Sequence, residues 1–173
     1  CYMVQEEELD TQQLEGVVVQ HDSGIKLILA PGNPLESDPL PTQSFHTLVE
    51  NLRRFYDYII IDTAPFLDEA LVAVIQSADE VVVVTTSTMP ALKDTRILFN
   101  LIQQLKEAPE SDDSTAGKDH IFLVLNQFDP KVSRITPDQI ANFLKHRIDA
   151  EIPFDLAGAV GSMNNGIPWI TVD

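Results

Sequence analysis

Asp62 has the position in this chain that points most clearly to chemistry, because it follows an apolar run and precedes Thr63-Ala64-Pro65. Ile59, Ile60 and Ile61 are β-branched in succession, which favours a strand covered on both faces, as in parallel sheets. Asp62 would then lie at the carboxyl end of this strand, the edge where open α/β sheets bind ligands. A cap on the turn into the next helix is the alternative role for this carboxylate.

Strand and helix patterns alternate along the chain, and these elements must position Asp62. The apolar runs predict strands over residues 24–31, 59–62, 80–85 and 121–126, the last three of them buried. Apolar stripes at helical spacing predict helices over residues 45–55, 67–75, 91–106 and 136–148. This order predicts an α/β fold with a mostly parallel sheet, right-handed crossovers and helices on both faces.

The clearest helix start is at Thr136, where Pro137 is expected at the first helical position and Gln139 at the third. Thr136 and Gln139 fit a capping box. Two segments are expected to be irregular: a proline-rich connector over residues 31–41 and a mobile surface loop over residues 107–119.

Composition limits the classes of function. The chain has 173 residues, 44% of them hydrophobic, which suits one soluble domain over residues 1–173. Eleven basic against 27 acidic residues give a formal charge of -16, which disfavours direct nucleic-acid binding. Cys1 is the only cysteine, so no internal disulfide is possible, and the four histidines lack metal-ligand spacing. We expect a cytoplasmic protein that continues before Cys1.

Taken together, these patterns resemble the MinD/ParA superfamily of deviant Walker ATPases, most closely the CpaE or TadZ type associated with pilus assembly and polar placement. The resemblance covers about residues 24–169. It is carried by the motifs Tyr56 to Thr63, Ala78 to Thr85, Leu123 to Asn126, Ile152 to Asp155 and Asn165 to Pro168. Arg134-Ile135-Thr136-Pro137 before a helix favours the CpaE side.

The resemblance implies a fold of the P-loop NTPase (SIMIBI) type, with ATP and Mg²⁺ as cofactors. Asp62 would act in catalysis, near the attacking water and the Mg²⁺ shell through water. Asn126 would hydrogen-bond the purine, since its amide offers a donor and an acceptor. Pro153, Phe154 and Asp155 would line the adenine. The alternatives are a turn residue for Asn126, a core residue for Phe154 and a helix cap for Asp155.

One family motif does not occur in the chain. A phosphate-binding loop needs Gly-x-x-x-x-Gly-Lys-[Ser/Thr], whose backbone amides and lysine hold the phosphates. The one Gly-Lys pair, Gly117-Lys118, is followed by Asp119, and Asp112 occupies the place of the first glycine. The strand that carries this loop in the family is missing with it, so strands would be left without a partner.

Three hypotheses remain. The chain is the carboxy-terminal part of a MinD/CpaE-like ATPase domain whose phosphate-binding loop lies upstream, and it forms a homodimer or binds a protein of a pilus or positioning system. Alternatively, it is a degenerate, non-hydrolysing localisation or assembly module. The third is an unrelated α/β domain. The ending Pro168 to Asp173 lacks a basic amphipathic helix, so we expect no intrinsic membrane affinity.

Overall fold

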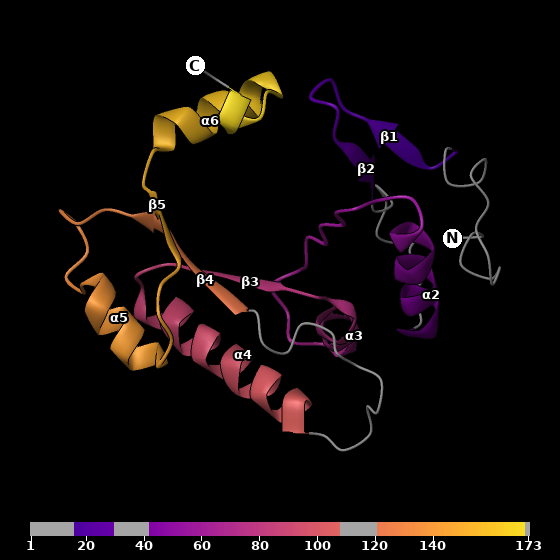
Figure 1. Cartoon of the computed structure of the whole chain (residues 1–173). Helices are drawn as coiled ribbons and strands as arrows, with labels where there is room; N and C mark the ends of the chain where they lie inside the picture. The colour runs from indigo at the N-terminus through magenta and orange to yellow at the C-terminus, as the bar shows by residue number, and fades with distance from the viewer. Residues whose placement is uncertain (1–15, 30–41, 108–120, 172–173) are drawn as a thin grey trace. The chain divides into compact units, whose positions relative to one another are not determined.

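The computed structural model describes residues 16–29, 42–107 and 121–171 (Figure 1). The chain divides into two compact units, Cys1–Ser77 and Ala78–Asp173, and each is described by itself. The described elements of the first unit are β1 (Val18–Gln20), β2 (Lys26–Ile28), α2 (Thr42–Arg53) and α3 (Glu69–Ser77). Those of the second are β3 (Val81–Thr85), α4 (Met89–Glu107), β4 (Ile121–Phe128), α5 (Pro137–Leu144), β5 (Ala150–Pro153), α6 (Leu156–Asn165) and η3 (Trp169–Thr171).

In the first unit, β1 and β2 form a short antiparallel hairpin with Val18 opposite Ile28. The Gly24 N–H closes the turn by donating to the His21 carbonyl at 2.9 Å. Gly24 has a φ of 88°, a left-handed angle that costs glycine little. The strand predicted over residues 24–31 is confirmed as β2. Its antiparallel partner was not predicted, because three residues are too few to show a period of two.

The described helices of the first unit, α2 and α3, are confirmed where apolar stripes predicted them. Their buried apolar side chains are Val49, Leu52, Ala73 and Ile75. The end of α3 is tied to α2 by polar contacts: Ser77 Oγ lies 2.7 Å from His46 Nδ1, and Arg53 Nη2 donates to the Ser77 carbonyl at 2.9 Å. Apolar packing and these hydrogen bonds therefore hold the pair together.

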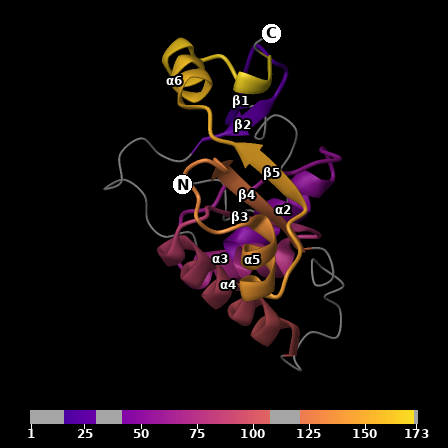
Figure 2. The ribbon, with the colours of Figure 1, turned by 90° about the vertical axis from the view of Figure 1, so that its left-hand side faces the viewer.

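The second unit is built on a parallel sheet of order β3-β4-β5, which confirms the α/β class. The order in the sheet follows the order in the chain, so crossovers of the usual right hand place both connecting helices on one face. Figures 1 and 2 show α4 and α5 on this same side. The core of this unit consists of Val83, Leu92, Ile102, Leu123, Leu125, Ile140 and Leu144.

The helix start predicted at Thr136 is confirmed. Thr136 Oγ1 accepts the Gln139 N–H at 3.3 Å, and the Thr136 N–H donates to Gln139 Oε1 at 3.0 Å. Both halves of the capping box therefore form at the start of α5. The helix ends at Lys145, whose left-handed angles, φ 55° and ψ 35°, turn the chain out of the helix.

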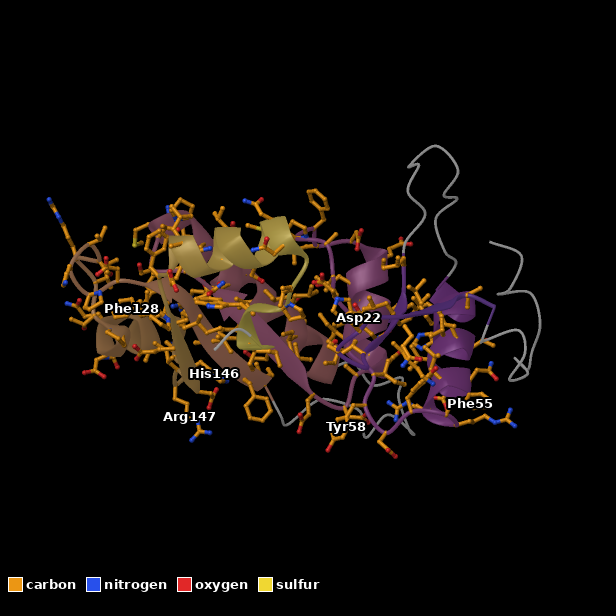
Figure 3. The ribbon with its side chains drawn as sticks, turned by 90° about the horizontal axis from the view of Figure 1, so that it is seen from above. Asp22, Phe55, Tyr58, Phe128, His146 and Arg147 are labelled. Atoms are coloured by element: carbon orange, nitrogen blue, oxygen red, sulfur yellow. The ribbon has the colours of Figure 1, made fainter. Side chains whose placement is uncertain are left out.

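The prediction of a buried strand before Asp62 is wrong. Residues 58–64 belong to no strand, and Ile60 is 94% exposed. Figure 3 shows the Tyr58 side chain on the outside of the ribbon. A strand needs a neighbour that pairs its backbone groups, and no described strand lies in register with this segment. β-branched residues favour the strand conformation, but this preference is not sufficient without a neighbouring strand to pair with.

The strand predicted over residues 80–85 is confirmed as β3, but full burial is wrong for part of it. Val82 is 59% and Val84 57% exposed, whereas Val83 and Thr85 are buried. The alternation follows from the placement of α4 and α5, since both cover the face that carries Val83. An uninterrupted apolar run therefore overstated how much of the strand is covered.

Some expectations fall outside the described residues. The connector over residues 31–41 lies there, and so does the loop expected over residues 107–119, apart from Glu107, which ends α4. Across the described ranges, no helix is long and apolar enough to cross a membrane.

Candidate functional site

The carboxyl ends of β3, β4 and β5 meet at one edge of the parallel sheet, because all three strands run in the same direction. The strands end at Thr85, Phe128 and Pro153. At this edge the Phe154 N–H donates to the Phe128 carbonyl at 3.2 Å. This bond joins the end of the Asn126 strand to the loop of Pro153, Phe154 and Asp155. Four of the five site residues predicted from the sequence therefore lie on two adjacent strand ends.

Asn126 lies near the end of β4, after the fully buried Leu123 and Leu125. Its own side chain is half-buried, and its Oδ1 accepts the Gln127 N–H at 2.9 Å. The amide is therefore held by its neighbour. A second lone pair of Oδ1 and the protons of Nδ2 can still bind another molecule.

The loop after β5 combines an aromatic and an acidic side chain. Phe154 is 51% exposed, so it is not the core residue that the alternative interpretation required. An exposed aromatic ring can stack on a planar base. Asp155 caps α6, since its Oδ1 accepts the Gly158 N–H at 2.9 Å. The structural alternative for Asp155 is thus confirmed, and any contact with a ligand stays a prediction.

Gly158 and Trp169 support this loop and were missed by sequence reasoning. A Cβ at Gly158 would lie 2.5 Å from Asp155 Oδ2 and 2.7 Å from Trp169 Nε1. The helix therefore needs glycine where the loop and η3 approach it. In the sequence this contact shows only as a single tryptophan eleven residues after a glycine. Such a spacing belongs to no helical or strand period and to no motif, so it does not predict a contact.

Threonines at the end of β3 form the third part of this edge. Thr95 of α4 donates from its Oγ1 to Thr85 Oγ1 at 2.8 Å, with both side chains buried. The Thr86 and Thr88 hydroxyls lie 3.1 Å apart, and the Thr88 carbonyl accepts the Leu92 N–H at the start of α4. The run Thr85-Thr86-Ser87-Thr88 was visible in the sequence as hydroxyl residues between a strand and a helix.

Asp62 belongs to the first compact unit, and Asn126 with the loop 153–155 belongs to the second. Within its unit, Asp62 is exposed and lies in the irregular segment after α2. The turn into α3 is capped by another acid, since Asp68 Oδ1 accepts the Leu71 N–H at 2.9 Å. Asp62 is therefore not the residue that caps this helix, and its catalytic role stays a prediction.

The described residues fit only part of a nucleotide. Asn126 and Phe154 offer an amide and an aromatic ring, the groups that recognise a base. Gly117-Lys118 lies outside the described residues, and within the described ranges no three His, Cys, Asp or Glu side chains are grouped to hold a metal ion. Asn126 and Phe154 thus have the chemistry of a base contact, whereas neither a Gly-x-x-x-x-Gly-Lys-[Ser/Thr] loop nor such a group of metal ligands lies within the described ranges.

A parallel α/β sheet with polar residues at its carboxyl edge is compatible with a P-loop NTPase-like fold, and comparison with known proteins shows that fold. A family model described as the AAA domain (AAA_31) matches residues 6–113. The chain belongs to this family. The relatives place it more closely in the MinD/ParA superfamily.

One similar protein is the septum site-determining protein MinD of Thermotoga maritima, 27% identical over 156 residues, which are 87% of this chain and 54% of MinD. Another is the tyrosine-protein kinase CpsD of Streptococcus pneumoniae, 33% identical over 98 residues, 55% of this chain and 37% of CpsD. The crystal structure of a ParA family ATPase from Chlorobium tepidum has a TM-score of 0.80 and 27% identity, covering 94% of this chain and 62% of that one. The chain thus spans about half the length of the MinD relative.

Proposed function

We propose that this chain is the base-binding part of an ATPase domain of the MinD/ParA type, whose phosphate-binding loop is supplied from outside the chain. Asn126 would hydrogen-bond adenine, and Pro153, Phe154 and Asp155 would line its ring. Asp62 would orient the attacking water. ATP and Mg²⁺ binding is general in this superfamily, which supports the proposal.

One observation carries this proposal: the hydrogen bond of 3.2 Å between the Phe154 N–H and the Phe128 carbonyl. It holds the Asn126 strand and the Phe154 loop side by side at the carboxyl edge of the sheet, where open α/β sheets bind ligands. An amide and an exposed ring on adjacent strand ends are suited to a planar heterocycle with donors and acceptors on its rim.

The narrower part of the proposal concerns the cellular role. Arg134-Ile135-Thr136-Pro137 favours a CpaE-like protein of pilus assembly or subcellular positioning, acting as a homodimer or with a protein partner in the cytoplasm. The formal charge of -16 supports a role without direct nucleic-acid or membrane binding, because such a charge repels phosphate backbones and anionic lipids.

The test is a titration of the chain with adenosine and with ATP, followed by ¹H–¹⁵N NMR. We expect adenosine to shift the resonances of Asn126, Gln127 and Phe154. ATP should bind more weakly than about 10 μM, roughly -7 kcal/mol, because the chain lacks the motif that holds phosphates. Shifts confined to other residues would refute the proposed base site. Tighter, saturable ATP binding would mean that residues outside the proposed base site hold the phosphates.

A degenerate, non-hydrolysing module is the second candidate, and the surface of α6 favours it. Leu156 and Met163 on this helix are exposed, as is Ile170 in η3. Exposed apolar residues on neighbouring elements such as α6 and η3 are common at protein interfaces. The same titration separates the two candidates, since a module that acts only through protein contacts has no reason to prefer adenosine.

A further inference from the structure

The pairing of β4 with β5 is interrupted beside Asn126. Leu125 pairs with Glu151, and Phe128 pairs with Pro153. Asn126 and Gln127 therefore stand opposite the single residue Ile152. An extra residue on one strand is a β-bulge, and bulges often re-aim a side chain next to a functional site.

Gln127 accommodates the extra residue through an unusual backbone angle. Its φ is 55°, in the left-handed region that side chains other than glycine adopt rarely. Among the described residues, Lys145 is the other non-glycine with a positive φ, also 55°. Lys145 ends α5, where this conformation is common. Gln127 ends no helix, so its angle calls for another explanation.

The bulge frees one peptide N–H from the ladder and gives it to the Asn126 side chain. The Gln127 N–H donates to Asn126 Oδ1 at 2.9 Å. Only oxygen can accept this bond, because a flipped amide would set the Nδ2 protons against the Gln127 N–H. The bond therefore fixes which end of the amide carries the acceptor.

We propose that the left-handed backbone of Gln127 locks the Asn126 amide in one orientation and thereby selects 6-aminopurines over 6-oxopurines. This inference rests on the proposed contact between Asn126 and the base. The free lone pair of Oδ1 can accept from the N6 amino group of adenine while Nδ2 donates to N7. With a 6-oxopurine, Oδ1 faces the O6 acceptor, and the bond from the Gln127 N–H keeps the amide from turning Oδ1 away so that Nδ2 alone contacts O6 or N7. Gln127 is thus a positioning residue.

Two substitutions at the same residue test the lock. Gln127→Gly keeps the left-handed angle available, whereas Gln127→Val disfavours it through a β-branched side chain. Lys145→Gly and Lys145→Val are the matched controls, because Lys145 has the same φ in the same unit and no bond to Asn126. All four variants of the full chain are compared with the parent by thermal unfolding, so that loss of stability is measured separately.

The first readout needs no ligand: the side-chain amide resonances of Asn126 and the hydrogen exchange of the Gln127 N–H. Both should change in Gln127→Val and stay as in the parent in Gln127→Gly and in both Lys145 variants. Unchanged Asn126 amide resonances in a folded Gln127→Val variant would overturn the lock.

The second readout is the ratio of the dissociation constants for inosine and adenosine, which differ at the 6-position. We expect Gln127→Val to lower this ratio about tenfold and Gln127→Gly to change it less than about twofold, since one bidentate amide contact discriminates against the wrong base by about tenfold or more. A parental preference for adenosine that survives in Gln127→Val would overturn the inference. If the parent binds neither nucleoside, the proposed function fails and the selectivity with it, while the amide resonances still decide whether the lock exists.

Discussion

The carboxylate of Asp149 accepts the backbone N–H of Leu123 at 2.9 Å, while the Asp149 N–H donates to the Leu123 carbonyl at 2.8 Å. This reciprocal pair lies just before β5 and holds the start of that strand against β4. Arg147 Nε lies 2.7 Å from Asp149 Oδ1, and Figure 3 shows Arg147 next to His146. The Leu123 N–H chiefly, then Arg147, hold the pKa of Asp149 below its usual value, although desolvation opposes them.

Asp149 should therefore make a contribution to the free energy of unfolding that depends on pH. Because its pKa is lower in the folded state, the contribution is present above the unfolded pKa of about 3.9 and is lost as the pH falls through the folded pKa. We expect Asp149→Asn to be less stable than the parent near neutral pH and to lose less stability on acidification below about pH 4. Urea unfolding over this range measures both effects.

Asp94→Asn is the control for that experiment, since Asp94 is an exposed carboxylate on α4. It should leave the neutral stability close to that of the parent. Equal stability and equal acid dependence of the two variants would contradict the role assigned to Asp149.

Gly158 should tolerate no side chain, because a Cβ there would lie 2.5 Å from Asp155 Oδ2 and 2.7 Å from Trp169 Nε1. Gly158→Ala must displace the indole or the loop before α6, at a cost of about 1–3 kcal/mol. Trp169 is the only tryptophan, so its fluorescence reports the displacement directly. Gly161→Ala in the same helix meets nothing within 4 Å, and we expect it to gain up to about 1 kcal/mol. Identical emission spectra of the two variants would show that the contact is not tight.

The buried pair Thr85 and Thr95 should fix α4 on the sheet. Thr95 Oγ1 lies 2.8 Å from both Thr85 Oγ1 and the Ala91 carbonyl. Thr95→Val keeps the shape but leaves the Thr85 hydroxyl with one long contact, 3.4 Å to the Thr86 carbonyl. We expect a loss of about 1–2 kcal/mol in the free energy of unfolding. Thr95→Ser retains the hydroxyl and should lose less, so a valine variant as stable as the serine variant would argue against this pair.

Local signals in the sequence predicted local structure well. The Thr136 and Gln139 side chains satisfy backbone groups within one turn, so the start of α5 depends on no distant partner. The apolar stripes of α2, α3 and α4 were likewise sufficient to predict these helices, because each helix makes its own backbone hydrogen bonds. The parallel pairing of β3 with β4 followed from the helix between them, since such a crossover is the usual way to join parallel strands.

Sequence patterns whose structure depends on a distant segment of the chain were less informative. Ile59 to Ile61 have the composition of a strand, but a strand is stable only beside another, and the sequence does not state whether one is present. The amide of Asn126 was visible as a candidate, whereas the bulge that orients it was not. Gln127 is neither glycine nor asparagine, so its residue type does not predict a left-handed backbone φ.

In a protein that contains this chain together with a phosphate-binding loop, loss of Asp62 should mainly affect turnover, whereas loss of Asn126 should mainly affect ATP binding. If Asp62 orients the attacking water, Asp62→Ala removes an interaction made in the transition state and leaves most ground-state contacts in place. Hydrolysis should fall by about 10²-fold or more, with ATP affinity much less affected. Asn126→Ala should weaken binding and relax the preference for adenine, with turnover at saturation nearly unchanged.

Single-turnover hydrolysis at saturating ATP, together with equilibrium binding of ATP and ITP, separates these effects. Asp57→Ala is the control for Asp62, because Asp57 is an exposed acid in the segment between α2 and α3. It should hydrolyse ATP at the parental rate. If Asp62→Ala does the same in a protein shown to be folded by circular dichroism, Asp62 is a surface residue of an irregular segment. Another group must then orient the attacking water, and the hydroxyl run Thr85 to Thr88 at the end of β3 is the next candidate.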